Sequence, residues 1–182
     1  MILISKIIRN TVWLLSEIEA LFSKPNDALH FRRLFLRIAK VKFCKYLWIG
    51  RSFHIENPSN LTLGERCALG NSVIIENYAP IVIGNDFMGS SGLTIGSGTH
   101  EPMDMKPRHL PIQIGHRVWC GFNVTILAGA TIGDDVVIGA GSIVTKNIPS
   151  NSIAAGIPAK VVKPLVRDAD TPIWTWARIN SR

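Results

Sequence analysis

The sequence of 182 residues contains only three cysteines, Cys44, Cys67 and Cys120, and no Cys-x-x-Cys pair. This count argues against a disulfide framework and favours reduced cysteines in a cytosolic protein. No stretch approaches the ~18 consecutive apolar residues of a membrane-spanning helix, because charged residues interrupt the Ile- and Leu-rich residues 1–22. The same stretch has no uninterrupted apolar segment followed by a small-residue cleavage site, so no secretory signal is predicted. We therefore expect a cytoplasmic protein.

Acidic residues are outnumbered: 13 Asp and Glu stand against 20 Lys and Arg, for a formal charge of +7. Half of the basic residues precede residue 52, and no aromatic-interleaved basic motif accompanies them. Nucleic acid is therefore not the expected partner. We expect residues 1–46 to form a helical N-terminal segment that packs on protein. The alternative is peripheral contact of this basic segment with the inner face of a membrane.

A period of six dominates residues 112–148, which is neither the 3.6 of a helix nor a simple alternation. One apolar residue recurs at every sixth position, and a second small or branched residue follows four positions later. These positions are Ile114, Cys120, Ile126, Ile132, Ile138 and Val144, followed by Val118, Val124, Ala130, Val136, Ser142 and Ile148. The pattern predicts an all-β solenoid of hexapeptide repeats in which both sets of residues point inward.

The repeat extends upstream and is interrupted there. Leu63, Leu69 and Ile75 keep the period, and the phase then shifts by two residues at Ile83. Residues 97–111 contain three prolines and have no period, which predicts a loop that protrudes from a corner of the solenoid. A loop of this length is unusual in a regular solenoid, which indicates that it has a function. We expect the solenoid to span residues 47–150 and a C-terminal extension to span residues 151–182.

His100 lies where the period stops. Counted from Ile95, Thr99 falls on the inward position and His100 on the outward one. An outward imidazole beside a loop is suited to act as a general base toward a hydroxyl group. A carboxylate is expected to orient this imidazole; Glu101 is the first candidate, and Asp104, Glu76 or a backbone carbonyl are the alternatives.

Several motifs accompany the repeat: GSGTHE (96–101), RVWCG (117–121), GAGSIVTKNI (139–148) and AAGIPAKVV (154–162). With them, residues 61–163 resemble the hexapeptide-repeat acyltransferases, in particular the sugar and surface-polysaccharide O-acetyltransferases. The resemblance implies a left-handed parallel β-helix and a homotrimer with active sites between subunits. It also implies direct transfer of an acetyl group from acetyl-CoA to a hydroxyl of a sugar or polysaccharide precursor, with His100 as the base and no metal.

The resemblance further implies roles for individual residues. On the acetyl-CoA side, Trp119 would lie along the pantetheine arm, and the small residues Ala140 and Gly141 would leave room for the cofactor. Thr145 and Lys146 would lie near the adenine. Lys160 and Lys163 would bind the phosphates. On the acceptor side, where the match is weaker, the candidates are Asn71 and His109.

Three other readings compete with this one. The acceptor could be a small molecule such as serine or an antibiotic. The chain could also be a non-catalytic solenoid scaffold. A metal-dependent hydrolyase similar to the zinc carbonic anhydrases would need three converging histidines, but His100, His109 and His116 lack the close His-x4-His pair of those enzymes.

Overall fold

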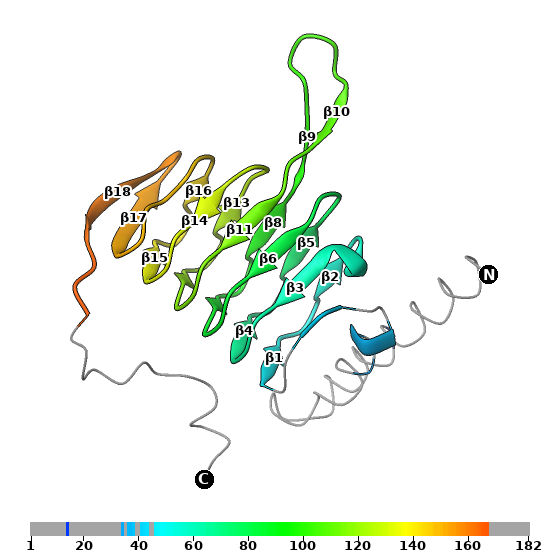
Figure 1. The fold of residues 1–182 in the computed structure, drawn as a ribbon, viewed down its shortest axis with the longest axis horizontal. Coiled ribbons are helices and arrows are strands. Elements are labelled where there is room, and N and C mark those ends of the chain that lie inside the picture. Colours follow the sequence, from blue (N-terminus) through cyan, green and yellow to red (C-terminus); the bar gives the residue numbers. More distant parts are fainter. Residues whose placement is uncertain (1–13, 15–33, 35, 39–40, 44–45, 168–182) are drawn as a thin grey trace.

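The computed structural model of the protein describes residues 14, 34, 36–38, 41–43 and 46–167. The helical segment predicted over residues 1–46 therefore lies largely outside the described residues, as does the end of the predicted extension from residue 168 on. The described strands wind into a parallel β-solenoid from which one hairpin protrudes (Figure 1). This confirms the solenoid predicted from the period of six.

Three sheets form the sides of the solenoid, and their strands pair in parallel from one coil to the next (Figure 1). Sheet A contains β3 (Leu61–Leu63), β6 (Ile81–Ile83), β11 (Ile112–Ile114) and β14 (Thr131–Ile132). Sheet B contains β1 (Leu47–Ile49), β4 (Cys67–Leu69), β7 (Met88–Gly89), β12 (Trp119–Cys120), β15 (Val136–Ile138), β17 (Ser152–Gly156) and β18 (Ala159–Pro164), the last antiparallel to β17. Sheet C contains β2 (His54–Ile55), β5 (Ile74–Glu76), β8 (Thr94–Gly96), β13 (Thr125–Ile126) and β16 (Ile143–Val144).

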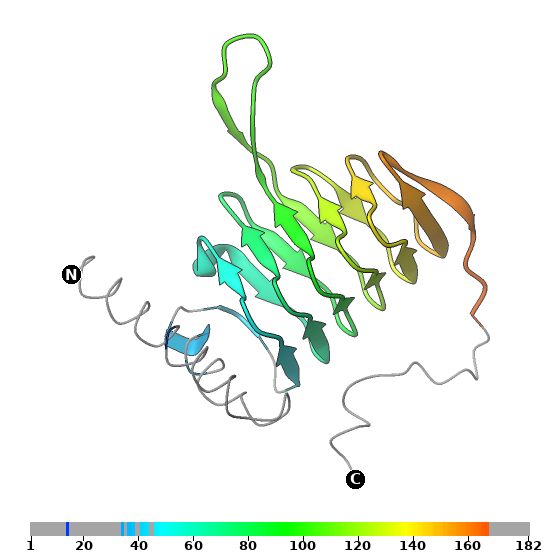
Figure 2. The ribbon, with the colours of Figure 1, turned by 180° about the vertical axis from the view of Figure 1, so that it is seen from behind.

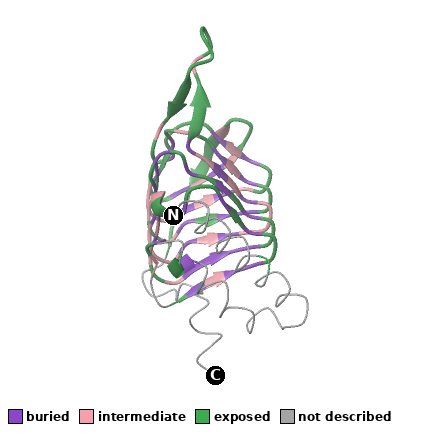
Figure 3. Ribbon diagram, turned by 90° about the vertical axis from the view of Figure 1, so that its right-hand side faces the viewer, coloured by how far each residue is buried: buried purple, intermediate pink, exposed green. Residues whose placement is uncertain are grey.

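The core is a column of inward side chains. Every inward residue predicted for residues 112–148 is buried, with at most 4% of its surface exposed. Figure 3 shows buried residues on the strands of coil after coil, whereas the protruding hairpin is exposed. One coil uses an unequal pair, the large Phe87 beside Gly89. A Cβ on Gly89 would lie 2.4 Å from Leu93 Cδ2, so the glycine makes room for its larger neighbours.

The three sheets meet at three edges, which we name by the sheets they join. The turns of edge AB begin at Gly64, Gly84, Gly115 and Gly133, and those of edge BC at Gly50, Gly70, Ser90, Gly121 and Gly139. The turns of edge CA follow the strands of sheet C, and all additional residues of the solenoid lie there. They comprise the turn with the short helix η1 (Pro58–Asn60), the turn 77–80 that causes the phase shift at Ile83, and residues 97–111.

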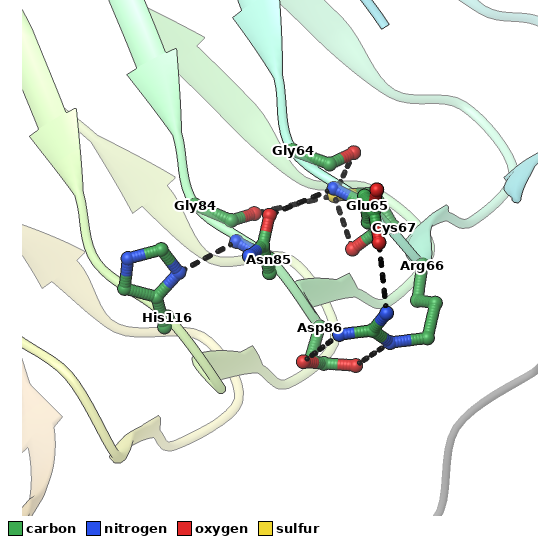
Figure 4. Close-up of polar contacts among 8 residues, drawn as sticks. All are labelled: Gly64, Glu65, Arg66, Cys67, Gly84, Asn85, Asp86 and His116. Atoms are coloured by element: carbon green, nitrogen blue, oxygen red, sulfur yellow. Dashed lines mark hydrogen bonds and ion pairs between the residues drawn. The ribbon is translucent and has the colours of Figure 1, made fainter. Parts of the chain in front are cut away.

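Edge AB is built from side chains that stack from coil to coil (Figure 4). The Oδ1 atom of Asn85 accepts a hydrogen bond from the N–H of Glu65 (2.9 Å), and His116 Nδ1 accepts one from the N–H of Asn85 (3.0 Å). Beside this ladder, Arg66 and Asp86 form a two-point ion pair, with N–O distances of 2.6 and 2.9 Å.

The same arrangement recurs two coils further on, where Arg117 contacts both carboxylate oxygens of Asp135 at 2.8 and 2.6 Å. Arg167 Nε adds a third contact to Asp135, at 3.0 Å. The side chains of edge AB thus hold neighbouring coils together. Within the described part of the chain, no helix has the length and apolar character needed to cross a membrane.

Candidate active site

The segment 97–111 leaves edge CA as a two-stranded hairpin (Figures 1 and 2). Its strands, β9 (Gly98–His100) and β10 (Pro107–His109), are antiparallel, and a hydrogen bond from Leu110 N–H to Ser97 O (2.9 Å) closes its base. Ser97 is the last inward residue before the hairpin and is fully buried, whereas Thr99 is exposed. The prediction that Thr99 points inward was therefore wrong, because strand pairing within the hairpin replaces the period of six two residues earlier.

Ser97 also fixes the hairpin to the preceding coil. Its hydroxyl accepts a hydrogen bond from the N–H of Ala79 at 2.8 Å and lies 3.1 Å from the carbonyl oxygen of the same residue. These contacts are buried, where a hydrogen bond is costly to lose. The start of β9 is therefore rigidly placed, and His100 lies three residues beyond the anchor.

His100 is exposed, and it makes no hydrogen bond to any other residue of the described ranges. Successive residues of a strand project to opposite faces, so Glu101 is directed away from the face that carries His100. Glu101 accordingly pairs with Arg108 (2.8 Å), the residue that lies opposite Thr99. The sequence predicted that Glu101 orients His100; the structure gives this carboxylate a different partner.

The other two candidate carboxylates differ from one another. Asp104 pairs with Lys106 at the hairpin tip (2.6 Å), and the hydrogen bonds from Lys106 hold the pKa of Asp104 below its usual range. Glu76 lies in β5 opposite Gly96, near the point where the hairpin departs. Among the described residues, the Glu76 side chain has no hydrogen bond or ion pair, so it remains available to a histidine or a ligand.

Trp119 lies on sheet B, on the side of the solenoid opposite edge CA. It is 45% exposed, and its Nε1 atom donates to Ser90 Oγ (3.4 Å) at edge BC. On the following strands of sheet B, the residues in register with Trp119 are Val137, then Ile153 and, on the last strand, Lys163. We call these four residues the sheet B row; three strand spacings of 4.7–4.9 Å make it about 14 Å long. Lys160 lies on the same last strand, opposite Ala155.

Ala140 and Gly141 lie in the adjoining turn of edge BC, and both are exposed. The N–H of Gly141 donates to Phe122 O (2.8 Å), which ties this turn to the preceding coil. Gly141 has a φ of 70°, a left-handed conformation that glycine adopts without strain. These two small residues therefore leave the surface open at this turn, and we call the turn the open shoulder.

The remaining predicted residues are spread over two edges. Asn71 lies on edge BC, where its Oδ1 atom accepts the N–H of Arg51 (2.8 Å). Thr145 and Lys146 are exposed in the turn after β16, on edge CA. The structure therefore does not bring all predicted site residues together within one chain: His100 and His109 lie on the hairpin, while Trp119, Lys160 and Lys163 lie on the opposite side.

One residue of this region was missed by the sequence reasoning. Tyr78 stacks on His109, with ring centroids 5.3 Å apart and an interplanar angle of 21°. It belongs to the turn 77–80, which holds the two additional residues between Ile75 and Ile83. The phase shift was the signal that could have drawn attention to it.

The described residues also bear on a metal site and on a nucleophilic cysteine. His116 lies at edge AB, where its Nδ1 atom is used by Asn85, so it does not converge with His100 and His109. Within the described ranges, no group of three His, Cys, Asp or Glu residues could hold a metal ion. Burial raises the pKa of the Cys120 thiol to about 12, so this cysteine stays protonated at neutral pH and is a poor nucleophile.

Comparison with known proteins adds to this geometry. The family described as bacterial transferase hexapeptide (six repeats) matches residues 111–146. A galactoside O-acetyltransferase of Escherichia coli K12 is 36% identical over 130 residues, which cover 64% of this chain and 63% of that protein. The chain thus spans less than two thirds of that relative's length.

A second relative and a solved structure match over more of their length. WcaF of Escherichia coli K12, a candidate colanic acid biosynthesis acetyltransferase, is 34% identical over 144 residues, which cover 78% of this chain and 79% of that protein. A structure of galactoside acetyltransferase in complex with coenzyme A superposes with a TM-score of 0.72 at 26% identity, covering 89% of this chain and 81% of that one.

Proposed function

The chain belongs to the hexapeptide-repeat acetyltransferase family, and on that premise we propose that it transfers an acetyl group from acetyl-CoA to a hydroxyl group of a sugar or surface-polysaccharide precursor. The observation that carries the proposal is the exposed imidazole of His100, which bonds to no side chain in the described part of the chain and lies on an anchored hairpin. The names of the relatives support the acceptor class, since one acts on galactosides and another is assigned to colanic acid biosynthesis.

The sheet B row supports acetyl-CoA as the donor. Trp119 offers exposed aromatic surface at one end of the row, and Lys163 offers a cation at the other, about 14 Å away. This separation is of the order of an extended pantetheine arm, and the charge of Lys163 suits a phosphate group. The open shoulder at Ala140 and Gly141 leaves space beside this path.

In the proposed reaction, His100 takes the proton of the acceptor hydroxyl while the oxygen attacks the thioester carbonyl carbon. A C–O bond forms, and the tetrahedral intermediate collapses by breaking the C–S bond. The imidazolium then returns its proton to the leaving thiolate, so the enzyme ends unchanged. Acetyl transfer is direct, and the protonated, buried thiol of Cys120 takes no part.

The test of this proposal is the loss of the base. His100→Ala should lower kcat by about 10² to 10⁴, the range of general base catalysis, and leave the KM for acetyl-CoA within about twofold. Release of free thiol from acetyl-CoA would be followed against a panel of sugars, nucleotide sugars and amino acids. His54→Ala, which removes an exposed histidine of sheet C, is the matched control. Near-normal turnover by His100→Ala would disprove this role.

We further propose that His100 of one protomer serves the sheet B row of a neighbouring protomer in a homotrimer. The support is that the two features lie on opposite sides of one solenoid, where a single chain cannot join them. His100→Ala and Trp119→Ala should each have strongly reduced activity alone. After subunit exchange at a 1:1 ratio, about one quarter of the sites in a head-to-tail ring should contain both intact residues. No recovery of activity in verified mixed oligomers would contradict a shared site.

A further inference from the structure

Tyr78 and His109 form a stacked aromatic pair at the base of the hairpin (5.3 Å, 21°), and Tyr78 remains 47% exposed. The pair has a defined position relative to β9. A Cβ on Gly98 would lie 2.7 Å from Tyr78 Cδ2, so the tyrosine ring occupies the space into which a side chain at position 98 would project. The glycine at this position is what allows the ring to lie against the strand.

This position brings the pair to the face of the hairpin that carries His100. Residues two apart in a strand project to the same face, so position 98 and His100 share one face, about 7 Å apart along the strand. His109 lies directly opposite Gly98 in the antiparallel register. The ion pair between Glu101 and Arg108 belongs to the other face. A molecule whose hydroxyl reaches His100 from this side therefore passes over the aromatic pair.

The backbone around Tyr78 is held on both sides. The preceding residue, Asn77, is fully buried, and its side chain bonds the N–H of Asn57 (2.8 Å) and the carbonyl oxygen of the same residue (2.5 Å). Asn60 Nδ2 donates to the carbonyl oxygen of Tyr78 (3.2 Å), and the following residue, Ala79, is fixed by Ser97. A ring on such a backbone loses little freedom when it binds a ligand.

We propose that Tyr78 and His109 form an acceptor subsite, in which their exposed ring surface stacks against the apolar face of a pyranose ring and holds one of its hydroxyls toward His100. This inference rests on the proposed acetyl transfer. It names the acceptor class more closely: an uncharged or weakly charged hexopyranose unit, whose axial C–H groups suit a flat aromatic surface. Tyr78 acts here as a positioning and specificity-determining residue, not as a catalytic one.

The proposal is tested by separating the acceptor KM from the other kinetic constants. Tyr78→Ala should raise the KM for a hexopyranoside acceptor about fivefold to tenfold, with the KM for acetyl-CoA within about twofold. Tyr78→Phe, which keeps the ring, should stay within about twofold of wild type for both constants. Met103→Ala removes a side chain that is 96% exposed at the hairpin tip and is the control on the same element.

A second variant guards against misfolding of Tyr78→Ala. Gly98→Ala keeps Tyr78 but adds the Cβ that would lie 2.7 Å from its ring, and it should raise the acceptor KM in the same direction. An unchanged acceptor KM in both Tyr78→Ala and Gly98→Ala, with unaltered circular dichroism, would overturn the subsite.

Direct binding distinguishes this inference from the proposed reaction. Saturation-transfer NMR of a methyl hexopyranoside should show enhanced signals from the protons of one sugar face with wild type and with His100→Ala, and weakened signals with Tyr78→Ala. Sugar binding without acetyl transfer would refute the proposed function and keep the subsite. Acetyl transfer to sugars with undiminished NMR signals in Tyr78→Ala would refute the subsite and keep the function.

Discussion

Replacement of Gly121 by alanine should loosen the coils at edge BC and weaken binding of acetyl-CoA. A Cβ at Gly121 would lie 2.8 Å from the backbone nitrogen of Ala140 and 3.0 Å from its Cα. Both distances are well inside van der Waals contact, and neither atom belongs to a flexible side chain. The clash can be relieved only by moving one coil away from the next.

Moving the coils apart would stretch two hydrogen bonds between them. Gly121 N–H donates to Ile138 O, and Gly141 N–H to Phe122 O, each at 2.8 Å, so the two coils are bonded on both sides of the clash. Overpacking of this kind costs about 1–3 kcal/mol. Loss of chain entropy in the unfolded state returns about 0.4–1 kcal/mol when glycine becomes alanine. We therefore expect Gly121→Ala to lower the free energy of unfolding by about 1–2 kcal/mol.

Gly96→Ala is the matched control, because a Cβ at Gly96 would meet nothing within 4 Å. Only the unfolded-state effect applies there, so this variant should be more stable than wild type by about 0.4–1 kcal/mol. Both variants would be compared by urea unfolding at one protein concentration. A Gly121→Ala protein as stable as Gly96→Ala would show that a Cβ at position 121 does not strain the coils.

The same variant tests the proposed donor site. Because Ala140 belongs to the open shoulder beside Trp119, its displacement should raise the KM for acetyl-CoA and leave the KM for the acceptor unchanged. The reverse split would place the shoulder on the acceptor side.

Two further predictions concern buried or paired groups. Burial raises the pKa of the Cys120 thiol to about 12, so this cysteine should resist a maleimide at pH 8 in the folded protein and react fully in urea. Mass spectrometry of the peptides would measure the labelling. Rapid labelling of the native protein would contradict the burial. Asp135→Asn should lower the free energy of unfolding by about 1 kcal/mol at pH 7, since Arg117 is about one-third exposed and water screens the pair. The hydrogen bond from Arg117 lowers the pKa of Asp135, so its stabilisation is complete above the ordinary carboxyl pKa near 3.9 and is lost as pH falls through the lower folded-state value. The difference in thermal midpoint between the two proteins should therefore begin to shrink as pH falls below about 4 and disappear once the pH is below the folded-state pKa of Asp135. A difference that did not shrink over this range would point to packing instead of charge.

The column of buried residues could be predicted from the sequence because burial in a solenoid repeats locally. Each inward residue from Ile114 to Ile148 occupies the position that the count of six assigns to it. The count failed at Thr99, where a different interaction decides the structure. Pairing of β9 with β10 takes the chain out of the solenoid after Ser97, and no period in the sequence specifies where a hairpin begins.

The site was less accessible to sequence reasoning, since neighbours in sequence are not neighbours in space. Glu101 follows His100 directly, yet strand geometry directs its carboxylate to the opposite face and to Arg108. Tyr78, 22 positions before His100, comes to the same face because the hairpin stands above the turn of the preceding coil. The phase shift at Ile83 marked that turn as unusual, but only the coil-to-coil stacking shows what the additional residues do.

The placement of additional residues at edge CA alone has a physical cause. At the start of turns of edges AB and BC, glycines such as Gly84 and Gly70 meet the backbone of the next coil closely: a Cβ would lie 2.6 Å from Gly115 O at Gly84 and 2.5 Å from Ser91 N at Gly70. An inserted residue there would separate two coils. Gly96, the last residue of β8 before edge CA, and Gly129, in a turn of edge CA, have no such backbone contact. This packing favours additional residues at the edge opposite sheet B, so His100, which lies on such an insertion, faces away from the sheet B row of its own chain. A second protomer is the simplest way to bring the two together, which is why the proposed shared site follows from the packing of the coils themselves.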